Sequence, residues 1–185
     1  MKTIILSGKS GAGKDMFASF LKDELEKVNK KALIMHYADA LKWILRDYYG
    51  WNGIKDEHGR SLLQQVGTDK VRASMPNYWT AVVVGFIDAI SSYDDFDIAI
   101  IPDARFENEI ELPEKILKDI VTVRINRTMP DGSKWVNPML TPEQLNHPSE
   151  TSLDKFNFDY IIHNDAGVDQ MRDSAWALLN DLKEI

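Results

Sequence analysis

Residues 8–15 read Gly-Lys-Ser-Gly-Ala-Gly-Lys-Asp and directly follow a short apolar run at residues 3–7. A helical pattern of apolar residues comes next, from Phe17 to Val28. The Gly-x-x-x-x-Gly-Lys spacing predicts a tight loop whose backbone N–H groups lead into a helix N-terminus and form a concave anion site. From that loop, Lys14 can reach the outer phosphates of a nucleoside triphosphate. The alternative is a glycine-rich turn with a chance lysine, which the strand and helix patterns on either side disfavour.

Asp15 departs from the usual form of this motif, in which a serine or threonine hydroxyl binds Mg²⁺. A carboxylate beside a triphosphate is repelled unless a cation lies between them, and carboxylates are ordinary Mg²⁺ ligands. We therefore expect Asp15 to contribute to a magnesium site. It can also complement the positive end of the helix dipole, and the two roles are compatible.

The whole chain has the composition of a globular protein, with 185 residues of which 44% are hydrophobic and 28% are charged. This length fits one domain with a sizeable core. The chain shows neither a membrane-spanning stretch nor a signal-peptide pattern, so we expect a cytoplasmic protein without a membrane partner. The net charge of −7 argues against a nucleic acid polymer as partner. The absence of cysteine excludes disulfides and thiolate metal sites.

Strand and helix patterns alternate along the chain, which predicts an α/β fold with a parallel five-stranded sheet and helices on both faces. Apolar runs rich in valine and isoleucine predict strands at residues 3–7, 32–37, 97–101, 120–125 and 158–163. Helical periodicity predicts helices at residues 14–28, 39–49, 61–74, 77–92, 107–118 and 168–182. Residues 50–59 interrupt the pattern with glycines and mixed charge.

Two further features lie where such sheets bind ligands. Asp103 follows the 97–101 strand, at the carboxyl edge of the sheet, so we expect it to serve a magnesium site together with Asp15. Its alternative role is that of a turn or helix-cap aspartate. Residues 128–148 are irregular, rich in proline, and follow Arg124 and Arg127, which predicts a lid that closes over the phosphates. The alternative is a mobile surface loop.

Arginine forks bind phosphate oxygens bidentately, so a second substrate that carries a phosphate would account for several of the seven arginines. We favour Arg72 and Arg105, and we give Arg60 and Arg46 less weight. The spacing of Arg60 and Arg72 places them about 120° apart on an α-helix. They would share one face only if that helix breaks, and Gly67 is the residue that could break it.

Six segments stand out in order along the chain. They are the loop at residues 8–15 with its Lys-Asp ending, Tyr37-Ala38-Asp39-Ala40-Leu41-Lys42, the segment from Arg60 to Arg72 with its Leu-Leu-Gln-x-x-Gly-Thr-Asp core, Asn77-Tyr78-Trp79, Asp103-Ala104-Arg105-Phe106-x-Asn108-Glu109, and His147-Pro148-Ser149-Glu150. Together they resemble the deoxynucleoside monophosphate kinases of bacteriophages, a family within the P-loop kinases. The Lys-Asp ending is shared with that family, so the departure at Asp15 supports the resemblance.

The resemblance implies ATP-dependent phosphorylation of a deoxynucleoside 5′-monophosphate to the diphosphate by direct in-line transfer, with ATP and Mg²⁺ as cofactors. It implies a single P-loop kinase domain at residues 1–185, with a core at about 1–37, 96–127 and 156–185, a helical insert for the monophosphate at about 38–95, and a lid at about 128–150. It also implies small nucleotides as partners, the host cytoplasm as the location of a phage-encoded enzyme, and a homodimer, as expected for many family members.

The resemblance and the motifs together assign the candidate site residues. The catalytic set is Lys14, Arg72, Arg105 and Arg127. The ATP-binding set is Gly8, Lys9, Gly11, Ala12, Gly13, Lys14, Asp15, Arg124 and Asn164, of which Asn164 rests on fold analogy alone. The acceptor-binding set is Asp39, Lys42, Arg60, Gln64, Thr68, Asp69, Arg72, Trp79, Arg105 and Glu150. The metal set is Asp15 and Asp103.

A monophosphate acceptor is largely dianionic at pH 7, so its phosphorylation needs no general base. Two alternatives stay open: a P-loop kinase for another small phosphorylated acceptor, such as phosphomevalonate, and a nucleotide-binding protein without catalysis. An aromatic base pocket that includes Trp51, Tyr78 or Trp79 would favour the nucleotide acceptor. A small and wholly polar pocket would favour the other acceptors.

Overall fold

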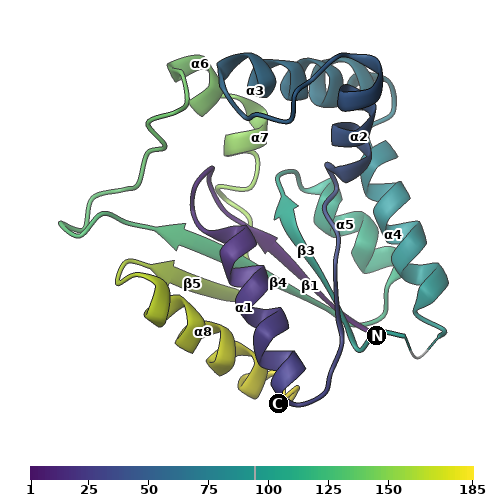
Figure 1. Cartoon of the computed structure of the whole chain (residues 1–185), viewed down its shortest axis with the longest axis vertical. Coiled ribbons are helices and arrows are strands. Elements are labelled where there is room, and N and C mark those ends of the chain that lie inside the picture. Colours follow the sequence, from purple (N-terminus) through teal and green to yellow (C-terminus); the bar gives the residue numbers. More distant parts are fainter. Residues whose placement is uncertain (94) are drawn as a thin grey trace.

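The described residues form a central sheet of five parallel strands, in the order β2-β3-β1-β4-β5 (Figure 1). The strands are β1 (Lys2–Ser7), β2 (Ala32–Ile34), β3 (Ile98–Ala104), β4 (Ile120–Arg127) and β5 (Tyr160–Asn164). This computed structural model describes residues 1–93 and 95–185. Because the strands are parallel, their carboxyl ends meet at one edge of the sheet. The predicted five-stranded parallel sheet is confirmed.

Helices cover both faces of the sheet. They are α1 (Lys14–Lys27), α4 (Tyr78–Ile90), α5 (Asn108–Ile116) and α8 (Val168–Asp181). Ile4 and Leu6 of β1 pack in one apolar cluster with side chains of α1 and α8. Ile5, which lies between them in sequence, packs in a second cluster with side chains of α4 and α5. Since successive side chains of a strand point to opposite faces, β1 contributes to both apolar cores.

A smaller apolar cluster lies beyond the carboxyl edge of the sheet, among the helices at the top of Figure 1. These helices are α2 (Asp39–Tyr48), α3 (Glu57–Gln64) and the π-helix η1 (Gln65–Arg72). A Cβ atom at Gly67 would lie 2.4 Å from Cδ2 of Leu41, so this glycine lets η1 approach α2 closely. Trp51 is buried in the same cluster and its indole N–H donates to the carbonyl oxygen of Ile54. Trp51 therefore packs inside this cluster, as such residues usually do.

The ends of the strands differ from the prediction, and for β2 and β3 the physical reason is visible. The strand predicted at residues 32–37 ends at Ile34, because the amide of His36 donates to Asp39 and the amide of Tyr37 donates to Asp103. Side-chain acceptors thus replace the strand partner. The strand predicted to stop before Pro102 continues to Ala104. The register with β1 shifts there, and an irregular position of this kind tolerates a proline inside a strand.

Two stretches that were predicted to be irregular contain helices. Within residues 50–59, α3 begins at Glu57, because the side chain of Asp56 accepts the amide of Gly59 and caps the helix. Within residues 128–148, the short α6 (Pro142–Leu145) begins with a capping box formed by Thr141 and Gln144. A second short helix, α7 (Pro148–Thr151), follows directly.

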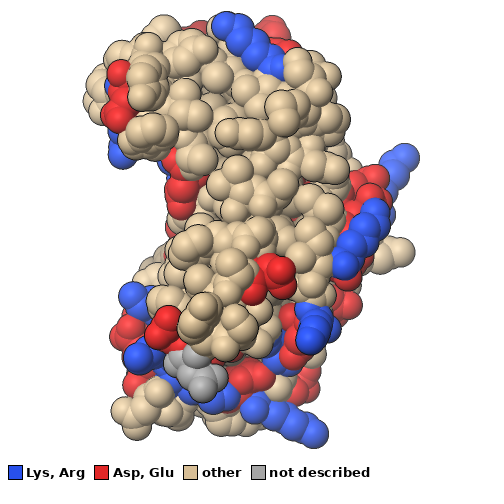
Figure 2. All heavy atoms as spheres, turned by 90° about the vertical axis from the view of Figure 1, so that its right-hand side faces the viewer, with Lys and Arg blue, Asp and Glu red and all other residues tan. Residues whose placement is uncertain are grey.

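The face on the α4 side of the molecule carries few charged side chains. Figure 2 shows a broad uncharged area there, with Lys, Arg, Asp and Glu mostly at its margins. Val82 and Phe86 of α4 are exposed, at 44% and 48%. The homodimer implied by the resemblance stays a prediction. None of the helices in the described part of the chain is long and apolar enough to cross a membrane.

Candidate functional site

The loop from Gly8 to Asp15 joins β1 to α1 and has the shape that its glycines allow. Gly13 caps α1 with φ 101°, a conformation that residues with a side chain rarely adopt. The buried Nζ of Lys14 donates to the carbonyl oxygens of Gly8, at 2.9 Å, and Lys9, at 3.1 Å. Burial lowers the pKa of Lys14 well below its usual 10.5, and the nearby charge of Arg105 lowers it further. An anion bound beside this amine would favour its charged form.

The two acids predicted to serve a metal, Asp15 at the end of this loop and Asp103 in the last part of β3, have different surroundings. The Asp15 side chain is 73% exposed and lies 3.0 Å from Nε2 of His36, a hydrogen bond that lowers the pKa of the carboxyl. Asp103 instead accepts the backbone amides of Tyr37, at 2.8 Å, and Ala38, at 3.1 Å. Its carboxylate thereby orients the start of α2, which is the turn role left open above. The described residues contain no group of three or more His, Cys, Asp or Glu side chains arranged to hold a metal.

A cavity of about 390 Å³ opens beside Lys14. Its cationic lining residues are Lys14, Lys42, Lys55, Arg60, Arg72 and Arg105, and its apolar and aromatic lining residues include Leu41, Leu63, Trp79 and Phe106. Eight of the ten predicted acceptor-binding residues line it: Lys42, Arg60, Gln64, Thr68, Arg72, Trp79, Arg105 and Glu150. The other two lie outside the lining. Asp39 pairs with Lys42 at 2.8 Å, and Asp69 lies 3.9 Å from the imidazole of His147.

The π-helix explains how Arg60 and Arg72 reach the same cavity. Residues 57–72 form one continuous helical stretch, in which α3 passes directly into η1. A π-helix closes i→i+5 hydrogen bonds and therefore turns less per residue than an α-helix. The expected angle of about 120° between the two arginines assumed an α-helix throughout. The helix does not break at Gly67, and the change of helix type takes the place of the expected break.

Glu109, for which no role was predicted, lies in the wall of the cavity and fixes its neighbours there. The side chain is 1% exposed and accepts hydrogen bonds from Arg72 and from the amides of Arg105 and Phe106. The guanidinium of Arg72 also lies over the Phe106 ring, 4.3 Å from its centroid. Burial raises the pKa of Glu109, and the charge of Arg72 opposes that shift. The sequence contains one signal that could have identified Phe106 and Glu109, because both belong to the same motif as Asp103.

Glu109→Gln should destabilise the protein by about 3–5 kcal/mol, because it leaves the Arg72 guanidinium buried without its counter-charge. The free energy of unfolding in urea measures this. Glu111→Gln, on the exposed side of the same helix, is the matched control and should change stability by about 0.5 kcal/mol or less. Equal stability of the two variants would show that the buried pair does not hold this wall.

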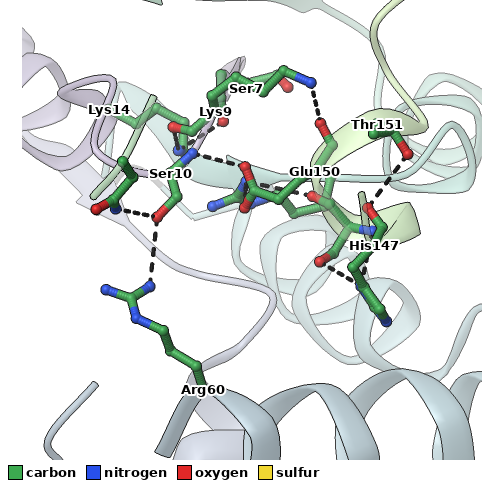
Figure 3. Close-up of polar contacts among 12 residues, drawn as sticks. Ser7, Lys9, Ser10, Lys14, Arg60, His147, Glu150 and Thr151 are labelled. Carbon is green, nitrogen blue, oxygen red and sulfur yellow. Dashed lines mark hydrogen bonds and ion pairs between the residues drawn. The ribbon is translucent and has the colours of Figure 1, made fainter. Parts of the chain in front are cut away.

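Residues 128–150, predicted as a lid, lie against the loop and converge on Ser10. The indole N–H of Trp135 donates to the Ser10 carbonyl oxygen at 3.2 Å. The side-chain amide of Asn137 donates to Oγ of Ser10 at 2.9 Å. The Ser10 amide donates to Glu150 at 2.9 Å, and Arg60 approaches Oγ from the opposite side (Figure 3). Sequence reasoning missed Ser10 and Asn137, because no local pattern shows contacts between residues so far apart in the chain.

Arg127 and Asn164 contact the loop, Arg124 contacts Ser7 at the end of β1, and none of the three lines the cavity. Arg124 donates to Oγ of Ser7 and pairs with Asp154. Arg127 donates to the Gly11 carbonyl oxygen, and its guanidinium lies 3.8 Å from the centroid of the Trp135 ring. The side-chain amide of Asn164 donates to the carbonyl oxygen of Ala12. These residues therefore lie around the loop and outside the lining of the cavity.

No protein-family model and no curated protein matches this chain. Among solved structures, it is similar to an APS kinase from Mycobacterium tuberculosis in complex with AMPPNP and APS, with a TM-score of 0.53 and 14% identity over 97% of each chain. It is also similar to a sugar kinase from a Janibacter species, with a TM-score of 0.58 and 12% identity over 97% of this chain and 95% of that one. A third similar structure is a tunicamycin resistance protein from Deinococcus radiodurans, with a TM-score of 0.51 and 14% identity over 96% of this chain and 95% of that one.

These likenesses, the parallel sheet and the position of the loop together show an α/β P-loop kinase fold. At identities this low, the likeness concerns the fold alone. The loop from Gly8 to Asp15 lies at the carboxyl end of β1, where this class of sheet binds its ligands.

Proposed function

We propose that this protein is an ATP-dependent kinase that transfers a phosphoryl group to a deoxynucleoside 5′-monophosphate. One observation carries the proposal: the cavity that opens beside Lys14 combines several cationic side chains with an aromatic wall. The glycine-rich loop suits the polyphosphate of ATP. The cavity suits a second anion that also carries a flat, apolar group. The likeness to solved kinases supports the class of reaction at the level of fold.

The lining of the cavity supports a nucleotide as acceptor. Trp79 and Phe106 offer aromatic surface, and Leu41 and Leu63 add apolar surface, so the pocket is not wholly polar. Gln64 and Thr68 can form hydrogen bonds with a base edge or a sugar. Of Trp51, Tyr78 and Trp79, the lining includes Trp79 alone, and Phe106 joins it there. A small polar acceptor would leave this apolar surface uncovered.

In the proposed reaction, the chain's own residues position the two substrates and supply positive charge around their phosphates. The loop would hold ATP, with Lys14 at its outer phosphates and with Arg124, Arg127 and Asn164 around it. Arg60 and Arg105 would hold the phosphate of the acceptor, and Arg72, fixed by Glu109, would complete the cationic wall. Since the acceptor is already dianionic, the main barrier is the repulsion between two anions. Oriented guanidinium and ammonium groups lower that barrier without proton transfer.

The surroundings of the two predicted metal residues differ in how well they fit Mg²⁺. This ion keeps several waters and binds through one or two carboxylates together with substrate phosphates. The exposed Asp15 carboxylate beside the loop fits that description, and Mg²⁺ held there would neutralise charge on the transferring phosphates. Asp103 uses both carboxylate oxygens to accept backbone amides, so we propose a role for it in placing α2 rather than in binding the ion.

The remaining parts of the account also stand as proposals. We propose the division into core, helical insert and lid, the homodimer and the host cytoplasm on the strength of the resemblance. The exposed Val82 and Phe86 of α4 offer a surface that a second copy would cover. The partners are ATP and a deoxynucleoside monophosphate, and not a nucleic acid polymer or a membrane.

A coupled assay for ADP formation tests the function, with and without each deoxynucleoside monophosphate. We expect at least one monophosphate to stimulate ADP formation well above the background of ATP hydrolysis. Stimulation by phosphomevalonate alone would favour the other acceptor class. Binding of ATP without turnover in the presence of any acceptor would favour a non-catalytic nucleotide-binding protein.

A further inference from the structure

The Glu150 carboxylate occupies the mouth of the loop. Its Oε2 accepts the amide of Ser10 at 2.9 Å (Figure 3). Its Oε1 accepts a hydrogen bond from Nη1 of Arg105 at 2.7 Å. The side chain is only 9% exposed. A negative group thus lies between the loop, which we propose holds the triphosphate, and the cavity, which we propose holds the acceptor.

Helix α7 is tied to the loop by additional contacts around this carboxylate. The ammonium group of Lys9 donates to the backbone carbonyl oxygen of Glu150 and pairs with Asp154 at 2.6 Å. Asp154 also pairs with Arg124 at 3.1 Å. The negative charge of Glu150 lies close enough to Lys14 to raise the pKa of that amine, opposing the larger effect of burial. Glu150 therefore places a negative charge near Lys14 of the loop and beside Arg105 of the cavity.

A polyphosphate and this carboxylate would compete for the same cationic groups, those of Lys14 and Arg105. A triphosphate held by the loop brings several negative charges beside Lys14, and like charges at close range repel each other. The Arg105 donor that binds Glu150 is not available to a phosphate at the same time. A carboxylate built into the chain competes at a high effective concentration, because it cannot diffuse away.

We propose that the Ser10 amide and the Arg105 guanidinium form an anion subsite that Glu150 fills as an internal occupant and that a phosphate of the bound nucleotide takes by displacing it. Displacement frees Arg105 to contact the transferring phosphates. Nucleotide affinity is thus lowered by the internal competitor, and Arg105 is released when the polyphosphate arrives. This inference rests on the proposed function only in taking a polyphosphate as the ligand of the loop.

Calorimetric titration of the purified protein with inorganic tripolyphosphate, and separately with Mg·ATP, tests the proposal. Glu150→Gln should bind both probes about tenfold more tightly than the wild type, a gain of about 1.4 kcal/mol. Glu143→Gln is the matched control, because Glu143 is an exposed acid of the same predicted lid that lies outside the cavity. It should bind both probes within about twofold of the wild type. Equal or weaker binding by Glu150→Gln would overturn the proposal.

Two further variants separate displacement from a general effect of charge. Glu150→Asp keeps the charge but is too short to hold both donors, so it should also bind tripolyphosphate more tightly than the wild type. In an Arg105→Ala background, Glu150→Gln should gain less, because the released guanidinium supplies part of the gain. Weaker binding by Glu150→Asp, or an equal gain in both backgrounds, would exclude the shared subsite. Circular dichroism of each variant confirms that it is folded.

The two proposals fail separately in this experiment. Tripolyphosphate carries neither a base nor a sugar, and its binding needs no acceptor. If no deoxynucleoside monophosphate is phosphorylated but Glu150→Gln still binds tripolyphosphate more tightly, the acceptor assignment fails and the subsite stands. If the monophosphate is phosphorylated but Glu150→Gln gains nothing, the function stands and the subsite fails.

Discussion

Lys14→Ala should lower the rate of phosphoryl transfer by about 10³-fold, the upper range for removing one preorganised donor to a developing charge. Lys14 Nζ is buried inside the loop, where the carbonyl oxygens of Gly8 and Lys9 hold it in place. The fold should survive, because burial disfavours the charged form of this amine in the absence of an anion. Steady-state kcat with saturating Mg·ATP and acceptor measures the first effect, and thermal unfolding measures the second.

The control for this variant is Lys22→Ala, on the exposed side of α1. It removes the same charge from the same helix and should leave kcat within about twofold of the wild type, as expected for a surface substitution. Near-normal turnover of Lys14→Ala would remove the loop from the mechanism. An unfolded Lys14→Ala would show that the lysine serves the structure instead.

Arg105→Ala should lower kcat/KM for the acceptor by about 10²- to 10³-fold. Arg105 lines the cavity and depresses the pKa of Lys14, so its charge acts on both proposed phosphate sites. Both kcat and the acceptor KM should change, because the guanidinium would bind the ground state as well as the transition state. Arg105→Lys should restore only part of the activity, since an ammonium group cannot reproduce the bidentate fork.

Arg172→Ala provides the comparison for Arg105. Arg172 lies on α8, pairs with Asp23 at 3.3 Å and does not line the cavity. Its loss should leave kcat/KM within about twofold of the wild type. If Arg105→Ala retained activity within the same margin, the acceptor phosphate would have to be held elsewhere.

Local patterns in the sequence were sufficient for the sheet and for the loop. The uninterrupted apolar run of Ile4, Ile5 and Leu6 indicates a strand buried on both faces. The spacing of Gly8, Gly13 and Lys14 predicts the turn into α1. Both signals depend on residues that are neighbours in the chain. The five strands and the parallel sheet were therefore predicted correctly, whereas no order of the strands was predicted.

The parts that sequence reasoning missed depend on partners far away in the chain. The early end of β2 follows from the Asp103 carboxylate, which lies 66 residues from Tyr37. The contact between Ser10 and Glu150 spans 140 residues. No single-sequence pattern places such groups together. The π-helix that ends at Arg72 was missed for a different reason, because helical periodicity does not distinguish a π-helix from an α-helix.

The candidate site likewise combines residues that the sequence identified with residues whose place depends on distant contacts. The resemblance supplied the order along the chain of the ten residues proposed to bind the acceptor, and eight of them line one cavity. Glu109 was quoted in a motif but given no role, because its importance comes from burial beneath Arg72. Asp39 and Asp69 were included from the same motifs, yet their contacts with Lys42 and His147 hold them outside the cavity lining.

The most direct measurement follows the terminal phosphate of ATP itself. Wild-type protein is incubated with Mg²⁺, ATP carrying a radiolabelled terminal phosphate, and each deoxynucleoside monophosphate in turn, and the products are separated by chromatography. We predict that the label appears in a deoxynucleoside diphosphate, in equal amount to the ADP formed. Label that stays in ATP, or appears only as inorganic phosphate with every monophosphate tested, would contradict the account.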